Sequence, residues 1–397
     1  MQQDRLRILT LMAACLVVFV PLSATSDDSP QATAATVTGV EFPVWDSQLT
    51  AWINDPADTR CDAPGGVLLV DSASGRYLRG AGVASLESQR AIDVNDRFEI
   101  GSNTKSFTVV LALQLQEAGL LSMDDPLGKW LPELAAKIPG GEQVTLRQLA
   151  GNRSGIRDYA DPLMQPLVDN NDQDGLAKEY APSDLVEYAL GQGAPSFEPG
   201  NSWQYSSTNF ILLGMVVETV TGKQLTELYQ ERIFDVLGMA DSFYRPASLP
   251  KDEVVNGYYT IPDGRIVDVT AWNLTQGGAA GGIISTAADM ARYAGALMHG
   301  KLFQKNATLE EMTGFTTLTI EQGGGFFAGY GLGLISYATN GFHAIGHSGQ
   351  TPGFQTIWFY VPEADSIVVF MTNSGSCPAG FLPFSLSPAD FGIMASG

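Results

Sequence analysis

Ser102-Asn103-Thr104-Lys105 follows a strand-like run, Phe98-Glu99-Ile100, at the point where the apolar residues change to helical spacing. On a helix, residues i and i+3 share a face with Cβ atoms roughly 5–6 Å apart, so Lys105 can reach the Ser102 hydroxyl. A lysine placed there can take the serine proton and later deliver one to a leaving group. The helix N-terminus also directs backbone N–H groups toward a developing oxyanion. The stretch therefore predicts an activated serine on a helix that runs to about Gly119.

Two further motifs carry polar side chains that could act in the same reaction. Tyr205-Ser206-Ser207 leads into an apolar helical run, Phe210 to Thr221. A tyrosine beside a lysine can work as a general base if the cation lowers its pKa. His347-Ser348-Gly349 precedes two strand-like runs, so we expect it at a strand edge, which can hold an extended substrate by main-chain hydrogen bonds. His347 and Ser348 would offer donors or acceptors to a bound carbonyl or carboxylate.

Strand patterns occur at both ends of the chain and helical patterns lie between them. Val67 to Val70 and Gly80 to Ala84 read as one hairpin, and Phe354 to Val361 with Ser366 to Thr372 read as another. From the helix after Ser102 to about residue 275 the pattern is mainly helix and loop. The fold class is therefore α/β of the α+β type: an antiparallel sheet flanked by helices, built from both termini, with an inserted, mostly helical lobe.

The expected domain organisation follows from these patterns. It comprises a signal peptide (1–26), a flexible leader (27–38), the first part of the sheet domain (39–105), the helical lobe (106–277), the second part of the sheet domain (278–376) and an irregular C-terminal tail (377–397).

The N-terminus has the features of a signal peptide. Arg5 and Arg7 precede an apolar run from Ile8 to Leu22, and Ala24-Thr25-Ser26 offers small residues for cleavage. The apolar run is short for a bilayer span, and no basic flank follows it. We therefore expect a secreted or periplasmic protein without a stable membrane span after cleavage.

Charge and cysteine usage narrow the classes of partner and cofactor. The formal net charge of −21 argues against nucleic acid and anionic membrane surfaces as partners. With only three histidines and three cysteines, no cluster has metal-ligand spacing, so we expect no metal and no cofactor. In an oxidising compartment Cys61 and Cys377 are compatible with one disulfide.

Together the three motifs resemble those of the serine penicillin-recognising enzymes, which carry Ser-x-x-Lys, Tyr-x-Asn and Lys/His-Thr/Ser-Gly. Their order and spacing are similar to the branch of class C β-lactamases and secreted Streptomyces-type D-alanyl-D-alanine carboxypeptidases. The resemblance implies that Ser102 is the acylated nucleophile and that Lys105 and Tyr205 manage its proton. It also implies an oxyanion hole made by the backbone N–H groups of Ser102 and Gln350. The implied substrate-binding residues are Ser207, His347, Ser348, Gly349 and Gln350.

The sequence departs from this family in three places. Ser207 stands where the motif has the Asn that contacts the acyl side of the substrate, and Asn209 lies two positions too far along to replace it. Ile335-Ser336 stands where the carboxypeptidase relative carries an Arg suited to a substrate carboxylate. Prolines 378, 383 and 388 make a long C-terminal helix improbable. Recognition of a free C-terminal D-alanine is therefore in question.

The resemblance implies an exported acyl-enzyme hydrolase of the D-alanyl-D-alanine carboxypeptidase or D-peptidase type that also reacts with β-lactams. Its substrates would be D-amino-acid peptides, β-lactams or esters. A class C-like β-lactamase, an esterase or amidase of the same fold, and a non-catalytic penicillin-binding receptor are the alternatives. An α/β-hydrolase is disfavoured because Gly346-His347-Ser348-Gly349-Gln350 lacks the closing glycine of its elbow and no histidine follows it.

Overall fold

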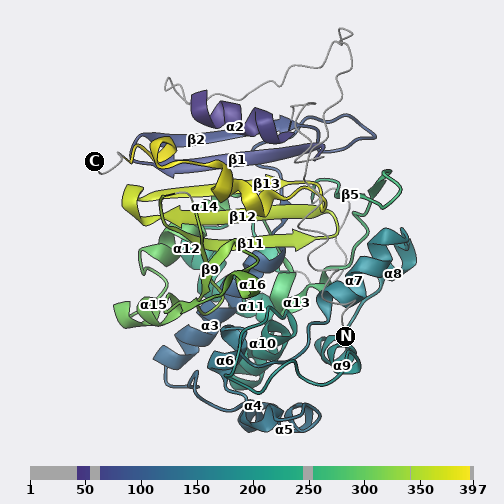
Figure 1. Cartoon of the computed structure of the whole chain (residues 1–397), viewed down its shortest axis with the longest axis vertical. Coiled ribbons are helices and arrows are strands. Elements are labelled where there is room, and N and C mark those ends of the chain that lie inside the picture. The colour runs from purple at the N-terminus through teal and green to yellow at the C-terminus, as the bar shows by residue number, and fades with distance from the viewer. Residues whose placement is uncertain (1–42, 54–62, 245–253, 340, 394–397) are drawn as a thin grey trace. The chain divides into compact units, whose positions relative to one another are not determined.

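The computed structural model describes residues 43–53, 63–244, 254–339 and 341–393 (Figure 1). All of them belong to one compact unit of the chain. The expected signal peptide and leader lie outside the described residues. The main feature of the unit is an eight-stranded antiparallel sheet. In spatial order its strands are β2 (Gly75–Gly82), β1 (Gly65–Ser72), β13 (Ser366–Thr372), β12 (Phe354–Val361), β11 (Ala344–Thr351), β10 (Ile335–Tyr337), β9 (Phe327–Tyr330) and β8 (Thr316–Thr317).

The centre of this sheet joins the first strand of the described chain to the last. β1 pairs with β13 so that Val67 lies opposite Met371 and Leu69 opposite Val369. All four side chains are buried. β1 continues into β2 through a turn at which Ser72 pairs with Gly75. The predicted antiparallel sheet built from both ends of the chain is therefore confirmed.

Helices cover both faces of the sheet because successive strand residues point to opposite sides. On one face Trp52 of α2 (Pro43–Ile53) packs against Phe370 of β13, with ring centroids 5.7 Å apart. On the other face Tyr293 of α14 (Ala287–Met298) packs against Trp358 of β12 at 6.0 Å. The Thr286 hydroxyl accepts the backbone N–H of Asp289 and so caps α14.

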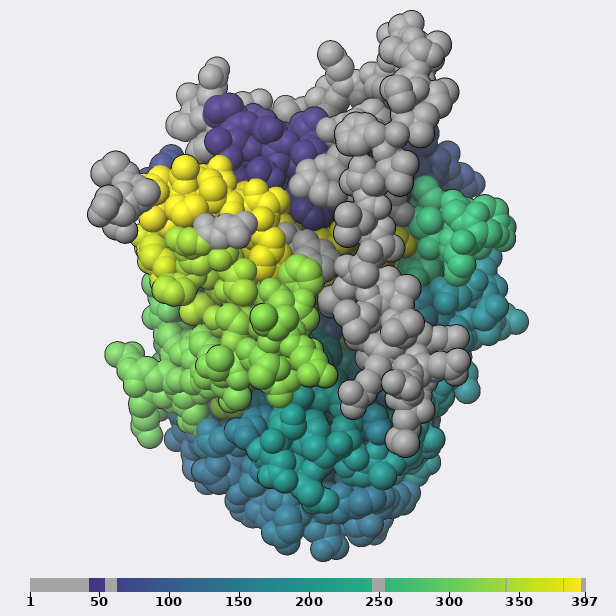
Figure 2. Space-filling model, in the orientation of Figure 1, coloured from purple at the N-terminus to yellow at the C-terminus, as the bar shows by residue number. Residues whose placement is uncertain are grey.

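Most of the remaining helices lie between the two strand-rich parts of the sequence. They are α3 (Thr104–Glu117), α4 (Leu127–Trp130), α5 (Pro132–Ala135), α6 (Leu146–Ala150), α7 (Ala160–Asp169), α8 (Gln173–Ala177), α9 (Pro182–Gly191), α10 (Thr208–Thr221), α11 (Leu225–Tyr229) and α12 (Asp235–Leu237). A π-helical turn, Gln230–Phe234, links α11 to α12. In the space-filling view the blue and teal residues of this region adjoin the yellow-green residues of the C-terminal strands (Figure 2).

Helix α3 connects the helical region to the sheet. Nearly all of its residues are buried, which is typical of a helix surrounded by protein on every side. It packs against α10 in the helical region. Its Phe107 stacks on Tyr293 of α14, with ring centroids 3.5 Å apart. The first turn of α3 is thus held between the helical region and the sheet with its covering helix α14.

The segment between 243 and 268 differs from the expectation of helix and loop alone. It contains β4 (Phe243–Tyr244), β5 (Tyr258–Thr260) and β6 (Ile266–Asp268). β4 joins β3 (Phe98–Glu99) and β7 (Ile283–Ser285) in a small second sheet. Strands of two or three residues are too short to show an alternating pattern, so the sequence does not reveal them.

The C-terminal tail contains only short elements over its described residues. They are 3₁₀ turns at Ala379–Phe381 and Pro388–Phe391 and the single-turn helix α17 (Leu382–Ser385). Cys377 is buried and disulfide-bonded. Cys61 lies outside the described residues, so its pairing with Cys377 stays a prediction. None of the helices described here is long and apolar enough to cross a bilayer.

Candidate active site

Ser102 lies in a 3₁₀ turn, Gly101–Asn103, that leads directly into α3. The turn is fixed by Asn103, whose Nδ2 donates to the backbone oxygen of Ile100 and to Oγ1 of Thr356, both at 2.7 Å. Ile100 is in turn bound to the small sheet, because its N–H donates to Ile283 O at 3.0 Å. Ser102 itself is only partly buried, so its hydroxyl sits on an anchored turn within reach of solvent.

Lys105 lies beneath Ser102 and has no solvent exposure. Its Nζ is 2.8 Å from Ser102 Oγ and donates to the backbone oxygen of Ala280 at 3.0 Å. Desolvation lowers the pKa of Lys105, and the carboxylates of Asp158 and Asp161 oppose part of that shift. Burial thus moves Lys105 toward the neutral amine, the form that can accept the serine proton.

Tyr205 completes this cluster. Its ring centroid lies 4.9 Å from Lys105 Nζ, and the interaction of its hydroxyl with Ser102 acts to lower its pKa. Desolvation raises the pKa of Tyr205, which is opposite to the direction expected from a neighbouring cation. The structure brings Ser102, Lys105 and Tyr205 together, and it favours a neutral phenol at Tyr205.

His347 lies on β11 beside these residues and is buried, with 1% of its surface exposed. Its Nδ1 is 2.6 Å from the backbone oxygen of Ser348, which can only accept, so Nδ1 carries the proton. Nε2 then accepts from the Tyr330 hydroxyl at 3.3 Å. Desolvation and the charge of Lys105 lower the pKa of His347 to about 3. The imidazole is therefore neutral near pH 7.

Two glycines let β11 contact the turn that carries Ser102. A Cβ on Gly349 would lie 1.9 Å from the backbone oxygen of Ile100, so only glycine fits there. Gly101 has a φ of +49°, and a Cβ on it would lie 2.7 Å from the backbone nitrogen of Gln350. The backbones of Ser102 and Gln350, expected to form the oxyanion hole, are thus brought together.

The edge of β11 is free where the substrate is expected. Its pairing with β10 ends at Gly346, and no other described strand continues it on that side. The side chains of Ser348 and Gln350 point to the opposite face from His347 and Gly349, because strand residues alternate. Ser348 lies against Gly380 of the tail, and Gln350 Nε2 donates to Gly375 O at 3.0 Å. The structure thus places these two side chains away from Lys105, while their backbone remains at the strand edge.

Ser207 lies at the start of α10, two positions after Tyr205, and is 4% exposed. Its N–H donates to Oδ1 of Asp158 at 2.8 Å. Asn209 does not take the place of the missing family amide. It is buried in a network in which its Oδ1 accepts from Ser154 Oγ and its Nδ2 donates to Asn152 Oδ1.

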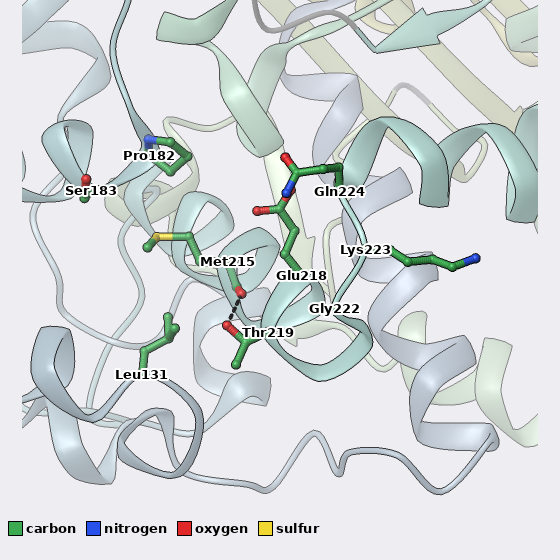
Figure 3. Close-up of a pocket in the computed structure, with 9 residues that line it drawn as sticks. All are labelled: Leu131, Pro182, Ser183, Met215, Glu218, Thr219, Gly222, Lys223 and Gln224. Atoms are coloured by element: carbon green, nitrogen blue, oxygen red, sulfur yellow. Dashed lines mark hydrogen bonds between the residues drawn. The ribbon is translucent and has the colours of Figure 1, made fainter.

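Asp158 and Asp161 are residues of the site that the sequence did not reveal. Their charges act on the pKa of Lys105, but nothing in the local sequence relates them to that residue. Across the described residues no group of three or more histidine, cysteine or acidic side chains could hold a metal ion. A surface pocket at the other end of α10, lined in part by Met215, Glu218 and Gln224, contains none of the predicted site residues (Figure 3).

Comparison with known proteins shows the family. The model of the beta-lactamase family matches residues 54–380. Penicillin-binding protein 4* of Bacillus subtilis is 25% identical over 323 residues, covering 78% of this chain and 68% of that protein. The D-aminopeptidase of Brucella anthropi is 28% identical over 338 residues, covering 84% of this chain and 60% of that protein.

A solved structure shows the same architecture. A D-stereospecific amidohydrolase from Streptomyces sp. superposes with a TM-score of 0.75 at 29% identity, covering 85% of this chain and 95% of that one. The family match over residues 54–380 contains the whole eight-stranded sheet, the helical region and the residues gathered around Ser102. The chain belongs to the beta-lactamase family of serine hydrolases.

Proposed function

We propose that the protein is a serine D-peptidase or D-amidohydrolase that works through an acyl-enzyme on Ser102. The observation that carries this proposal is the 2.8 Å contact between Lys105 Nζ and Ser102 Oγ, in a setting that favours the neutral amine. A buried neutral amine next to a partly exposed hydroxyl is the arrangement that activates a serine. The similarity to a D-aminopeptidase and to a D-stereospecific amidohydrolase supports D-amino-acid derivatives as the substrate class.

The proposed reaction has two symmetrical halves. Ser102 Oγ attacks the carbonyl carbon, and its proton passes to Lys105 Nζ. The negative charge on the carbonyl oxygen is held by the backbone N–H groups of Ser102 and Gln350. The Tyr205 hydroxyl gives its proton to the departing nitrogen or oxygen and regains one from Lys105. Water then attacks the ester carbonyl of the acyl-enzyme and gives up a proton. Lys105 and Tyr205 pass a proton to Ser102 Oγ as it leaves.

The electrostatics of the site favour substrates that lack a carboxylate beside the scissile bond. His347 is neutral near pH 7 and supplies no charge to an anion. Ser336 of β10, at the position where the resemblance leads one to expect an arginine, is uncharged. Amides, esters and peptides that continue beyond the cleaved bond therefore fit better than a free C-terminal D-alanine. Carboxypeptidase and β-lactamase activities stay predictions of the resemblance alone.

Turnover and adduct formation test the proposal together. Purified protein is assayed with D-phenylalanine amide, p-nitrophenyl acetate, a D-Ala-D-Ala peptide and benzylpenicillin, beside the variant Ser102→Ala. We expect the wild type to hydrolyse the amide and the ester, and Ser102→Ala to hydrolyse neither. We also expect intact-protein mass spectra to show a covalent adduct on the wild type alone. Ser88→Ala, at an exposed serine, is the matched control. Equal turnover by wild type and Ser102→Ala would refute the acyl-enzyme. If no substrate were turned over, the hypothesis of a non-catalytic penicillin-binding receptor would be favoured instead.

Export rests on residues 1–26 and is likewise a proposal. Expression of the full chain, followed by N-terminal sequencing of the protein recovered outside the cytoplasm, tests it. Recovery of the uncleaved chain in the cytoplasm would contradict it.

A further inference from the structure

Tyr205 lies on a stretch of chain that no helix or strand holds in place. Residues 202–206 have no regular secondary structure, and α10 begins only at Thr208. The ring of Tyr205 is bounded by two other rings, with centroid distances of 6.3 Å to Tyr330 and 6.2 Å to His347. These ring contacts limit the phenol but do not hold the backbone that carries it.

Asn152 binds the backbone on both sides of Tyr205. Its backbone oxygen accepts the N–H of Gln204 at 3.1 Å, and its side-chain Oδ1 accepts the N–H of Ser206 at 3.1 Å. Nδ2 of Asn209 donates to the same Oδ1 at 2.9 Å. Asn152 and Ser206 have no solvent exposure, so water does not replace a bond that is lost between them. One residue thus fixes the residues before and after Tyr205.

The backbone conformation of Asn152 restricts which residue can do this. Its φ is +57°, in the left-handed region that glycine, asparagine and aspartate occupy most readily. A glycine would keep the bond to the N–H of Gln204 but would lack Oδ1. Nδ2 of Asn152 is buried and makes no hydrogen bond with any described residue. The feature that matters is therefore an acceptor oxygen carried on a left-handed backbone.

We propose that Asn152 is a positioning residue that acts on the reaction through Tyr205. In the proposed reaction the Tyr205 hydroxyl gives its proton to the departing nitrogen or oxygen. Such a transfer requires the two heavy atoms to be within hydrogen-bond distance, so a small displacement of the phenol is costly. By holding residues 204 and 206, Asn152 keeps the phenol within reach of the leaving group. This inference rests on the proposed function and adds a residue to the same site.

Substrates with different leaving groups separate this role from a general loss of structure. The leaving groups of D-phenylalanine amide and D-phenylalanine methyl ester must each receive a proton, whereas p-nitrophenolate leaves as a stable anion. Asn152→Gly keeps the left-handed backbone and removes only the side chain. We expect this variant to lower kcat for the first two substrates by about 10- to 100-fold, with little change in KM. The first-turnover release of p-nitrophenolate from p-nitrophenyl acetate should change by less than about threefold, because it needs no proton from Tyr205.

Tyr205→Phe tests whether Asn152 acts through the phenol. Once the hydroxyl of Tyr205 is gone, adding Asn152→Gly should lower turnover of the amide or methyl ester by less than about twofold, because residues that act as a unit are not additive. A further loss as large as the one in the wild-type background would overturn the inference. So would equal losses in a folded Asn152→Gly for all three substrates.

Two other variants complete the comparison. Asn171→Gly is the matched control, because Asn171 has a φ of +50° but is exposed and lies just after α7. It should leave all three rates unchanged. Asn152→Asp keeps an acceptor oxygen, serves if the glycine variant does not fold, and should retain most of the activity that Asn152→Gly loses. A folded Asn152→Asp that loses as much as Asn152→Gly would contradict the inference.

The wild type distinguishes failure of the inference from failure of the proposed function. If it hydrolyses these substrates and Ser102→Ala does not, the acyl-enzyme stands whatever the Asn152 variants show. If the wild type turned over none of them, the proposed function would fall and the role of Asn152 with it.

Discussion

At the scale of single residues, burial is what turns Lys105 from a cation into a base. A lysine in water titrates at about 10.4. Here the side chain has no solvent exposure and desolvation lowers its pKa. We expect kcat/KM for a neutral ester to rise with pH along a limb well below that ordinary value, because the amine must be neutral to accept the Ser102 proton. A limb near pH 10 would contradict this assignment. Lys105→Arg, which stays protonated, should be inactive across the range.

Glu99 predicts a second pH dependence, this time of stability. It lies on β3 just before the Ser102 turn, and desolvation raises its pKa to about 8, partly offset by the Thr351 hydroxyl. The unfolded chain releases this proton at lower pH than the folded one. The contribution of Glu99 to the free energy of unfolding is therefore fully present below the ordinary glutamate pKa and is lost as pH rises toward 8.

Glu99→Gln should accordingly flatten the fall in melting temperature between pH 5 and pH 8. Thermal unfolding of wild type and variant across that range measures the difference, with Glu87→Gln at an exposed site as control. Parallel curves for wild type and Glu99→Gln would show that Glu99 is not held neutral.

Residue by residue, the sequence predicted the contacts that are local or that belong to a recognisable motif. Ser102 and Lys105 meet because they are one helical turn apart. Tyr205 and His347 were reached through the family resemblance. Asp158 and Asp161 were not predicted, because their electrostatic effect on Lys105 joins residues that are far apart in the chain and share no motif. The expectation of a lowered pKa at Tyr205 also left out the burial of this side chain. Desolvation raises the pKa by more than the nearby amine lowers it.

At the scale of elements, the contact between β11 and the Ser102 turn sets the geometry of the oxyanion hole. A Cβ on Gly349 would overlap the backbone oxygen of Ile100. Gly349→Ala must therefore push β11 away from the turn. Displacements of about 1 Å can cost on the order of 100-fold in rate, and we expect a kcat loss of that size.

Steady-state kinetics on the ester measure this loss, and circular dichroism checks that the fold remains. Gly191→Ala, at a helix end with nothing within 4 Å of the added Cβ, is the matched control and should leave kcat unchanged. Full activity in Gly349→Ala would show that the close contact does not position the oxyanion hole.

Elements differ in how far their pattern reveals them. β12 and β13 span the predicted ranges, Phe354 to Val361 and Ser366 to Thr372. Two long apolar runs joined by a Pro-Glu-Ala-Asp turn are typical of a hairpin. β4 is held by its pairing with the distant strand β7, and β5 pairs with β6 over three residues; no sequence pattern marks strands this short.

At the scale of the whole molecule, Cys377 offers a test of how the two ends of the chain are joined. It is disulfide-bonded beside the central strands, and Cys61 is its predicted partner. Removing such a bridge typically costs roughly 2–5 kcal/mol. We expect Cys61→Ser and Cys377→Ser each to lower the melting temperature by several degrees, and by the same amount as reduction of the wild type. Peptide mapping of the non-reduced protein identifies the bridge, and a Cys61 found as a free thiol would disprove it.

The pairing of β1 with β13 also has a consequence for synthesis of the chain. Val67 and Met371 are separated by nearly the whole described sequence, so the central ladder is a contact of very high order. A growing chain presents the β1–β2 hairpin long before its partner strand leaves the ribosome. Such an unpaired apolar edge is a template for pairing with other chains, and non-local pairing is slow. Rapid, crowded translation should therefore yield inclusion bodies, whereas slower translation gives each chain time to finish before it meets another.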